Sequence, residues 1–320
     1  MTSDTADHRV TFGLLDTSIG TANLGDQVIV RAVRVALAEC GVDIHAALPT
    51  HRKWSLEEVK SAAKVDYWIF AGTNMLQSKA LRHQPWKMSF RQFRLLRRKV
   101  VLFGVGAWQY QRGLSPLMRV FYAELLAKDV LHSVRDEYSL YKLRRIASNV
   151  VNTSCPTLWM VLSRGTQLGP AKKVVTTLTD YSKDITQDRI LLQLLAESYD
   201  EVVLWPQGQG DAAYARSIGF EGTILDPEVE ALSRLEAQEF DYVGSRLHGG
   251  VLALQQGMRA HIIAVDNRAI EIGKDTGLAV TPRIALTNTS NVLAPTPDLR
   301  LPTEAIERFR SELKVLGGLQ

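Results

Sequence analysis

The chain has 320 residues, of which 46% are apolar and 22% charged, and this ordinary globular composition argues against a disordered protein. The 38 Lys and Arg residues exceed the 34 Asp and Glu residues by four, and two cysteines are too few for a disulfide framework. The start of the chain is polar, and no apolar run approaches the ~20 residues that span a bilayer. We therefore expect a soluble, cytoplasmic protein.

The first half of the chain alternates short apolar runs with longer amphipathic patterns. The runs predict strands over 10–16, 43–48, 66–71, 99–105, 130–134 and 149–152. The amphipathic patterns predict helices over 25–40, 55–63, 86–98, 115–128 and 137–147. Around 156–171 the alternation breaks and Gly and Pro appear, which is typical of a connection between domains.

The second half repeats the alternation. We predict strands over 172–179, 201–206, 222–225, 240–244, 260–265 and 283–286, and helices over 186–199, 208–218, 227–236, 246–256, 268–274 and 303–316. The last helix would begin at a Thr303 cap. Apolar strands that alternate with helices favour parallel sheets covered on both faces.

The fold class we predict is α/β, with two Rossmann-like, doubly wound domains that face a central cleft. The amino-terminal domain would span 1–158, the linker 159–171, the carboxy-terminal domain 172–300, and a carboxy-terminal helix 301–320. Ligands of such sheets bind where strands end and helices begin.

A basic block spans residues 67–123, which contain ten Lys and Arg but no Asp or Glu. Such a block attracts an anionic substrate or surface, although a solvated helix face would have the same composition. Within it, helical spacing places Phe90, Phe93 and Leu96 near one face, which we interpret as facing the core. The arginines leave a peripheral contact with an anionic membrane open, and we expect no nucleic-acid partner.

The sharpest motif lies in 240–257, where an apolar strand ends at Gly244 and a helix follows. Ser245 is a good helix cap, and it would put Arg246 and His248 in the first turn. Because a helix N-terminus is electropositive, two cationic residue types there suit a bound phosphate or carboxylate. The glycines at 249 and 250 are explained by close approach of a ligand or of the facing strand.

Five motifs resemble those of one family. Ser245–Gly250 resembles the R-L-H signature of the polysaccharide pyruvyl transferases. The family's other motifs have counterparts at Asn23–Ile29 (N-x-G-D-x-x-I), Phe70–Asn74 (a glycine motif), Ser133–Ser139 (V-R-D-x-x-S) and Cys155–Thr157 (C-P), in the family's order. The resemblance implies a fold like the two-domain GT-B glycosyltransferases. It also implies transfer of the pyruvyl group of phosphoenolpyruvate to a saccharide of the bacterial cell envelope or an exopolysaccharide, as a ketal, with release of phosphate.

The resemblance also implies which residues form the site. Phosphoenolpyruvate would lie among Arg135, Ser245, Arg246, Leu247, His248 and Gly249, with His248 as the catalytic residue. His248 would move a proton near neutral pH, or would only bind the phosphate. The acceptor or the loops around it would involve Asn23, Asp26, Gly72, Asn74 and Arg268. Asn23 and Asp26 are equally well explained as caps of the helix that follows.

We expect no metal, because the seven His residues form no H-E-x-x-H motif and the cysteines form no cluster. No cofactor is expected beyond phosphoenolpyruvate as co-substrate. The partners would be this donor and a saccharide acceptor, including one attached to a lipid at the inner face of the membrane.

The chain also departs from the family's pattern. After the R-L-H helix, Gly257-Met258-Arg259 lacks the family's usual proline, and Arg268 stands near the position of a family lysine. An Arg–Lys exchange changes the geometry of a site. Two other functions therefore stay open: a GT-B sugar-nucleotide enzyme, that is a glycosyltransferase or an epimerase, and a non-catalytic protein that binds an anionic ligand.

Overall fold

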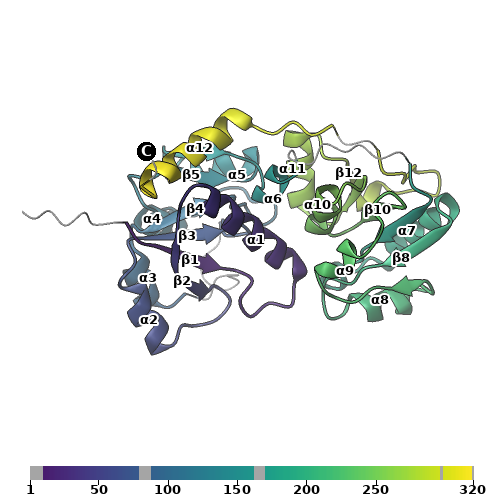
Figure 1. The fold of residues 1–320 in the computed structure, drawn as a ribbon, viewed down its shortest axis with the longest axis horizontal. Coiled ribbons are helices and arrows are strands. Elements are labelled where there is room, and N and C mark those ends of the chain that lie inside the picture. Colours follow the sequence, from purple (N-terminus) through teal and green to yellow (C-terminus); the bar gives the residue numbers. More distant parts are fainter. Residues whose placement is uncertain (1–9, 79–87, 162–169, 296–297, 319–320) are drawn as a thin grey trace, which may run out of the picture.

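A computed structural model of the chain describes residues 10–78, 88–161, 170–295 and 298–318. The chain forms two lobes, each built on parallel strands with helices on both faces (Figure 1). The strand and helix alternation predicted from the sequence is confirmed in both lobes, and with it the α/β fold class. The predicted domain boundaries stay predictions, because linker residues 162–169 lie outside the described part.

The amino-terminal lobe is built on a four-stranded parallel sheet of order β2-β1-β3-β4. Its strands are β1 (Phe12–Asp16), β2 (Ile44–Pro49), β3 (Tyr67–Ala71) and β4 (Val100–Phe103). Two further parallel strands, β5 (His132–Val134) and β6 (Val150–Asn152), pair with each other, and a bridge from Val105 to Val134 connects them to the end of β4. The strands are apolar because both faces are buried.

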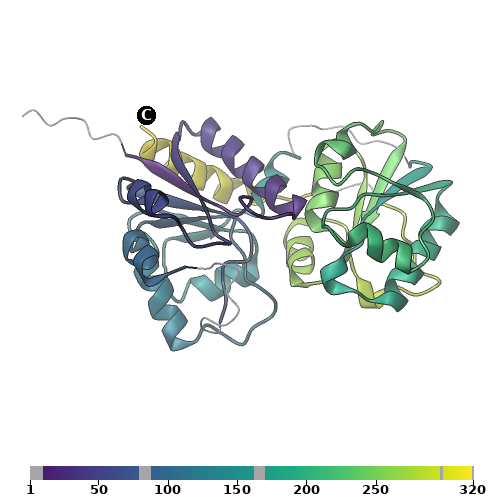
Figure 2. The ribbon, with the colours of Figure 1, turned by 90° about the horizontal axis from the view of Figure 1, so that it is seen from below.

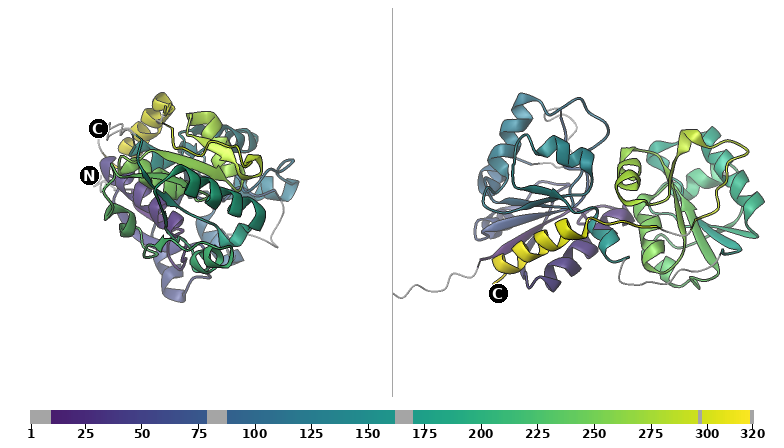
Figure 3. Two further views of the ribbon diagram at one scale, coloured as in Figure 1. Left: turned by 90° about the vertical axis from the view of Figure 1, so that its right-hand side faces the viewer. Right: turned by 90° about the horizontal axis from the view of Figure 1, so that it is seen from above.

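Helices cover the two faces of this sheet. On one face, α1 (Leu24–Glu39) and the carboxy-terminal helix α12 (Thr303–Leu316) pack against β1, β3 and β4. The opposite face is covered by α2 (Leu56–Ala62), α3 (Phe90–Leu96), α4 (Pro116–Leu125) and α5 (Glu137–Leu143). Figure 2 shows from below the helices on the two faces of this sheet. Figure 3 shows α12 returning from the carboxy-terminal lobe to lie beside α1.

The carboxy-terminal lobe has a six-stranded parallel sheet of order β12-β11-β10-β7-β8-β9. The strands are β7 (Lys173–Thr176), β8 (Glu201–Leu204), β9 (Thr223–Ile224), β10 (Phe240–Gly244), β11 (Ala260–Ala264) and β12 (Val280–Pro282). The helices are α7 (Ile185–Ser198), α8 (Asp211–Ser217), α9 (Glu230–Ser233), α10 (Leu247–Gln255) and α11 (Asn267–Thr276). A short helix, α6 (Pro156–Trp159), lies at the junction of the lobes.

Helix α1 connects the two lobes. Leu24 and Val28, in its first turns, belong to the core of the carboxy-terminal lobe, whereas Ile29 and Val33 belong to the core of the amino-terminal lobe. The backbone N–H of Leu24 donates to the carbonyl of Gln207 at 3.2 Å. The start of α1 is therefore fixed against the carboxy-terminal lobe.

Three local predictions are wrong. The strand expected over 283–286 is a 3-10 turn, Arg283–Ala285, and β12 precedes it. The last helix begins at Thr303 as predicted, but its cap residue is Pro302 and no side chain caps it. Phe90 does not face the core; it is exposed, while Leu96 is buried and Phe93 packs against the core.

Candidate functional site

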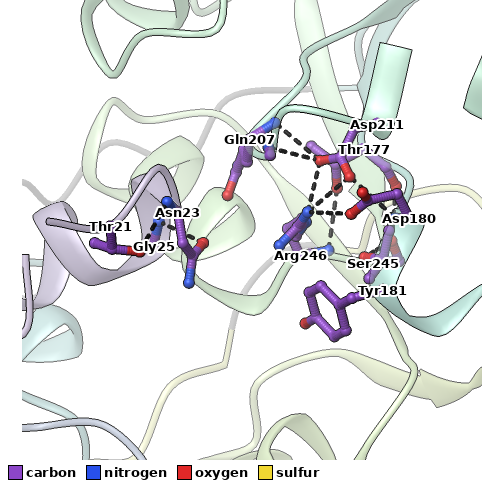
Figure 4. A network of polar contacts seen from close by, with 12 residues as sticks. Thr21, Asn23, Gly25, Thr177, Asp180, Tyr181, Gln207, Asp211, Ser245 and Arg246 are labelled. Atoms are coloured by element: carbon purple, nitrogen blue, oxygen red, sulfur yellow. Dashed lines mark hydrogen bonds and ion pairs between the residues drawn. The ribbon is translucent and has the colours of Figure 1, made fainter. Parts of the chain in front are cut away.

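A pocket of about 430 Å³, counted with the solvent at its mouth, lies where α1 of the amino-terminal lobe meets the carboxy-terminal lobe (Figure 4). Its walls come from both lobes. The lining residues are Asn23, Gly25, Asp26, Tyr181, Gln207, Ser245, Arg246, Leu247, His248, Val265, Asp266, Arg268 and Ala269.

Three helices begin at this pocket. Helix α1 begins after the cap residue Asn23, α10 after Arg246 and α11 after Asp266, and all three cap residues line the pocket. The first N–H groups of a helix have no intrahelical partner, and the helix dipole is positive at that end. The convergence of three such ends favours a negatively charged ligand.

Arg246 is one of the two arginines that line the pocket. Its Nη2 donates to both carboxylate oxygens of Asp211 at 2.7 Å, and its guanidinium lies over the Tyr181 ring, 4.8 Å from the centroid. Within the described residues its buried Nε–H has no hydrogen-bond partner. An unpaired buried donor costs about 1–3 kcal/mol, so Arg246 still has a donor to offer a ligand.

Gln207 provides a second such donor. It follows strand β8 and lines the pocket, and its buried Nε2 likewise has no partner among the described residues. The backbone N–H groups of Gln207 and Gly208 both donate to Asp211, at 3.0 and 2.9 Å. The same carboxylate therefore fixes both the Gln207 loop and Arg246.

His248 lies in the first turn of α10, between the two lobes. Its Nε2 is 3.6 Å from Sγ of Cys155, and a methyl group at Gly25 would lie 3.5 Å from its Nδ1. Burial, together with the positive charges of Arg268 and Arg135, lowers the pKa of His248 to about 3. Its surroundings therefore keep the imidazole neutral near pH 7 in this structure, and proton transfer by His248 stays a prediction.

Arg135 does not line the pocket. It is fully buried after β5, where its Nη2 donates to Oδ1 of Asn74 at 2.6 Å and its Nε lies 3.3 Å from Asp136. A methyl group at Gly106 would overlap its guanidinium. The positive charge of Arg135 nevertheless contributes to the low pKa of His248. Direct contact of Arg135 with a donor stays a prediction.

The glycine motif after β3 does not line the pocket; it orients the side chain of Asn74. Gly72 and Thr73 both have left-handed backbone angles, with φ of 61° and 63°. A β-branched residue rarely adopts this conformation, and such strain is typical of a constrained turn. The turn places Asn74 where it accepts from Arg135. Acceptor contacts of Gly72 and Asn74 stay predictions, and neither residue lines the pocket.

Arg268 lies at the pocket, in the first turn of α11. It makes a bidentate ion pair with Asp266, the cap residue of the same helix, and its Nη2 donates to the Tyr181 hydroxyl at 3.0 Å. Burial works against the ionised form of Asp266, but the Arg268 guanidinium outweighs it and leaves the carboxyl with a lowered pKa. Arg135, Arg246 and Arg268 thus each have a carboxylate partner.

The first turn of α1 forms the opposite wall. The Asn23 side chain accepts from the Gly25 N–H at 3.2 Å, which confirms the helix-cap interpretation for Asn23. Asp26 lines the pocket and is partly exposed, and Thr21 donates to it at 3.3 Å. Burial raises the pKa of Asp26, against the opposing charges of His51 and Arg268.

Two details of the R-L-H motif differ from the prediction. Ser245 is not a helix cap, because its hydroxyl donates to the Thr177 carbonyl and Arg246 takes the cap position. Gly249 does not line the pocket; a methyl group there would overlap Gln207 Nε2. Ser245 and Leu247 do line it.

Gln207, Asp211, Tyr181 and Asp266 were not predicted from the sequence. The position of an aspartate soon after strand β8 was a signal that could have marked Asp211. In the part of the chain that the structure describes, no three His, Cys, Asp or Glu side chains gather as a metal site would require. None of the described helices is both long and apolar enough to cross a membrane.

Comparison with solved structures finds the same two-lobed, GT-B-like architecture. UDP-N-acetylglucosamine 2-epimerase from Rickettsia bellii matches with 11% identity and a TM-score of 0.50, over 97% of this chain and 95% of that one. MnaA of S. aureus with UDP (12%, TM-score 0.48, 97% and 96%) and the wall teichoic acid polymerase TagF (10%, TM-score 0.41, 96% and 82%) are more distant in shape. At these identities the likeness concerns the fold alone.

No curated protein matches the chain. The model of the polysaccharide pyruvyl transferase family matches residues 23–267, which is more than half of the chain. The match begins at the cap of α1 and ends in the first turn of α11, so it contains every described wall of the pocket except Arg268 and Ala269. The chain belongs to the polysaccharide pyruvyl transferase family.

Proposed function

We propose that this chain transfers the pyruvyl group of phosphoenolpyruvate to two hydroxyls of a saccharide, forming a cyclic ketal and releasing phosphate. Its family makes it a transferase-type enzyme of polysaccharide biosynthesis. The observation that carries the proposal is a pair of buried donors, Arg246 Nε and Gln207 Nε2, in a pocket at which three helices begin; neither donor has a hydrogen-bond partner among the residues that the structure describes. Phosphoenolpyruvate places two anionic groups close together, and such a ligand would satisfy both donors.

The donor would lie over the first turn of α10. Its phosphate would accept from Arg246 Nε and from the N–H groups at the start of that helix, and Gln207 would hold a second oxygen. The Asp211 carboxylate keeps the Arg246 guanidinium in one orientation, so little freedom is lost when the ligand binds. The same donors would stabilise the negative charge that develops as the phosphate leaves.

The reaction needs one proton at C3 and two hydroxyls at C2 of the donor. A proton added to the C3 methylene makes C2 electrophilic, the first hydroxyl attacks C2, and the C2–O bond to phosphate breaks as the second hydroxyl closes the ring. Two hydroxyl protons are released and one is taken up by C3, so the other leaves with the phosphate or with solvent. His248 lines the pocket, and we assign to it the transfer of the C3 proton.

The first turn of α1 would face the acceptor. Asp26 lines the pocket from the lobe opposite Arg246, and burial raises the pKa of its carboxyl. A carboxylate with a raised pKa is a better base, so Asp26 would take a proton from the attacking hydroxyl. In the N-x-G-D motif, Asn23 would then cap helix α1 and Asp26 would act as the base.

Titration calorimetry with phosphoenolpyruvate and with a UDP-sugar tests the donor. We expect binding of phosphoenolpyruvate, and phosphate release when a suitable saccharide is added. In Arg246→Lys the charge stays but Nε is lost, so donor affinity should fall about 10–100-fold, the scale of one or two charge-assisted hydrogen bonds.

The matched control is Arg259→Lys. Arg259 also makes a buried bidentate pair, with Asp241, in the same lobe but away from the pocket. This variant should lower the melting temperature and leave donor affinity within about twofold of wild type. Binding of the UDP-sugar in place of phosphoenolpyruvate would support a sugar-nucleotide enzyme instead. Donor binding without phosphate release from any saccharide tried would favour a non-catalytic binder.

A further inference from the structure

The outward face of α3 and α4 carries large apolar side chains that the amino-terminal core does not use. Phe90 of α3 is 75% exposed, and Leu117 and Val120 of α4 are 57% and 62% exposed. Single exposed apolar residues are common, but several on adjacent helices indicate a contact surface.

These side chains belong to one surface because the two helices pack side by side. The rings of Phe93 and Phe121 stack with centroids 5.3 Å apart. Phe90 lies one turn before Phe93 on α3, and Leu117 lies one turn before Phe121 on α4. The exposed residues therefore flank a shared aromatic contact.

The exposed charged residues of α3 and α4 are all basic. Arg91 and Arg94 of α3 and Arg119 of α4 are exposed, and neither helix has an acidic residue in its first turn, where helices favour one. Glu124, at the end of α4, is already paired with Arg97 and Arg98. We call Phe90, Arg91, Arg94, Leu117, Arg119 and Val120 the α3–α4 surface; Lys79, Arg82 and Lys87 of the basic block lie outside the described residues.

We propose that the α3–α4 surface docks on an anionic lipid bilayer. The three arginines would lie at the lipid phosphates, while Phe90, Leu117 and Val120 enter the headgroup region. A second copy of the chain is a poor occupant, because it would bring two sets of arginines together. Nucleic acid would satisfy the charge but leave aliphatic side chains such as Leu117 and Val120 without an apolar layer to enter.

The expected association is peripheral and reversible. A basic residue near an anionic surface contributes about 1 kcal/mol, and three arginines with three inserted apolar side chains give an affinity that salt weakens. This inference goes beyond the proposed reaction and does not depend on the donor. Its failure would leave phosphoenolpyruvate binding untouched.

Sedimentation with lipid vesicles tests it on the full chain. Vesicles of phosphatidylcholine with about one third phosphatidylglycerol should bind the protein at least 10-fold more tightly than vesicles of phosphatidylcholine alone, and salt near 0.5 M should remove most of the difference. The charge variant Arg91→Gln/Arg94→Gln/Arg119→Gln and the apolar variant Phe90→Ser/Leu117→Ser/Val120→Ser should each lower this affinity about 10-fold or more.

The control variant is Ile284→Ser/Arg300→Gln, which removes an apolar side chain that is 85% exposed and an exposed arginine from elsewhere on the molecule. It should bind as wild type does, and circular dichroism should show all variants folded. Equal binding to neutral vesicles, unchanged binding by both surface variants, tighter binding to an oligonucleotide than to anionic vesicles, or a dimer that the apolar variant abolishes would each overturn the proposal.

Discussion

His248 shows how burial and ligand charge together set the state of a single residue. Burial and two nearby guanidinium groups lower its pKa to about 3, so the imidazole is neutral near pH 7. A unit charge about 4 Å away contributes roughly 4 kcal/mol at an effective dielectric constant near 20, which corresponds to about three pKa units. A doubly negative donor over α10 would therefore raise the pKa of His248 past neutral pH.

We predict that donor binding takes up a proton at His248. Calorimetry at pH 7.5 in Tris and in HEPES, whose ionisation enthalpies differ, should give binding enthalpies that differ by the protons absorbed. In His248→Gln this difference should disappear, and turnover should fall by about 100-fold or more because the group that carries the proton is gone.

The melting temperature of His248→Gln is the control for folding. It should stay within a few degrees of wild type, since the glutamine occupies a similar volume. Equal enthalpies of the wild type in the two buffers would show that the donor does not charge the imidazole, and His248 would then only bind the phosphate as a neutral donor.

Helices α1 and α10 each contain a glycine near the pocket, but a side chain at the two positions would disturb different things. In α1, a methyl group at Gly25 would lie 3.3 Å from the movable side chain of Asn23 and 3.5 Å from His248, so it fits but narrows the pocket. In α10, a methyl group at Gly250 would overlap Cδ1 of Ile262 on β11. The first glycine leaves space for a ligand, and the second allows the helix to pack on the sheet.

We predict opposite phenotypes for alanine at these positions. Gly25→Ala should keep the melting temperature, because alanine favours the helix, but should weaken donor binding about 10-fold. Gly250→Ala should lower stability by about 1–3 kcal/mol through overpacking and leave the donor affinity of the folded fraction unchanged. Thermal melts and calorimetry on both variants check this. Normal donor binding by Gly25→Ala would show that the ligand does not approach α1.

The extent to which the sequence predicts this molecule depends on how far apart the interacting residues are in the chain. The strands are predictable because burial on both faces makes each an apolar run, and the wrong strand at 283–286 had only a short apolar run that lies outside the sheet. The R-L-H motif can be recognised in the sequence because its residues are contiguous. The ion pair of Arg246 with Asp211 cannot be predicted in this way, because the two residues stand at the starts of two helices that only the parallel sheet brings together.

The hydrogen-bond partners of Arg135 and the protonation state of His248 could not be predicted from the sequence either, because both depend on residues that are distant in the chain. Arg135 was expected to touch the donor, but its partners Asn74 and Asp136 come from a strained turn and from the next helix cap. The neutral state of His248 results from burial between two lobes. Residue types and spacing identify the chemical groups, whereas packing decides which of their hydrogen-bond donors are still available to a ligand.

At the scale of the whole molecule, buried neutral histidines should make the fold sensitive to acid. His132 is fully buried; its Nδ1 accepts from the Leu102 N–H and its Nε2 donates to the Ala127 carbonyl, and burial lowers its pKa to about 4. Burial also lowers the pKa of His248 to about 3. An unfolded histidine binds a proton below about pH 6.5, so between pH 6.5 and 4 the unfolded chain binds more protons than the folded one.

Stability should therefore fall as the pH drops through this window, by about 1.4 kcal/mol per pH unit for each such histidine. Urea denaturation at pH 7, 6 and 5 should show this slope in the wild type. In His132→Gln the unfolding free energy should fall less steeply with pH, by nearly the ~1.4 kcal/mol per pH unit that one proton contributes, whatever the variant's stability at pH 7. The control His45→Gln, at an exposed position, should keep the wild-type slope. If His132→Gln and the wild type lost stability in parallel, the imidazole at position 132 would already be charged in the fold, and the hydrogen bond from Leu102 could not exist as described.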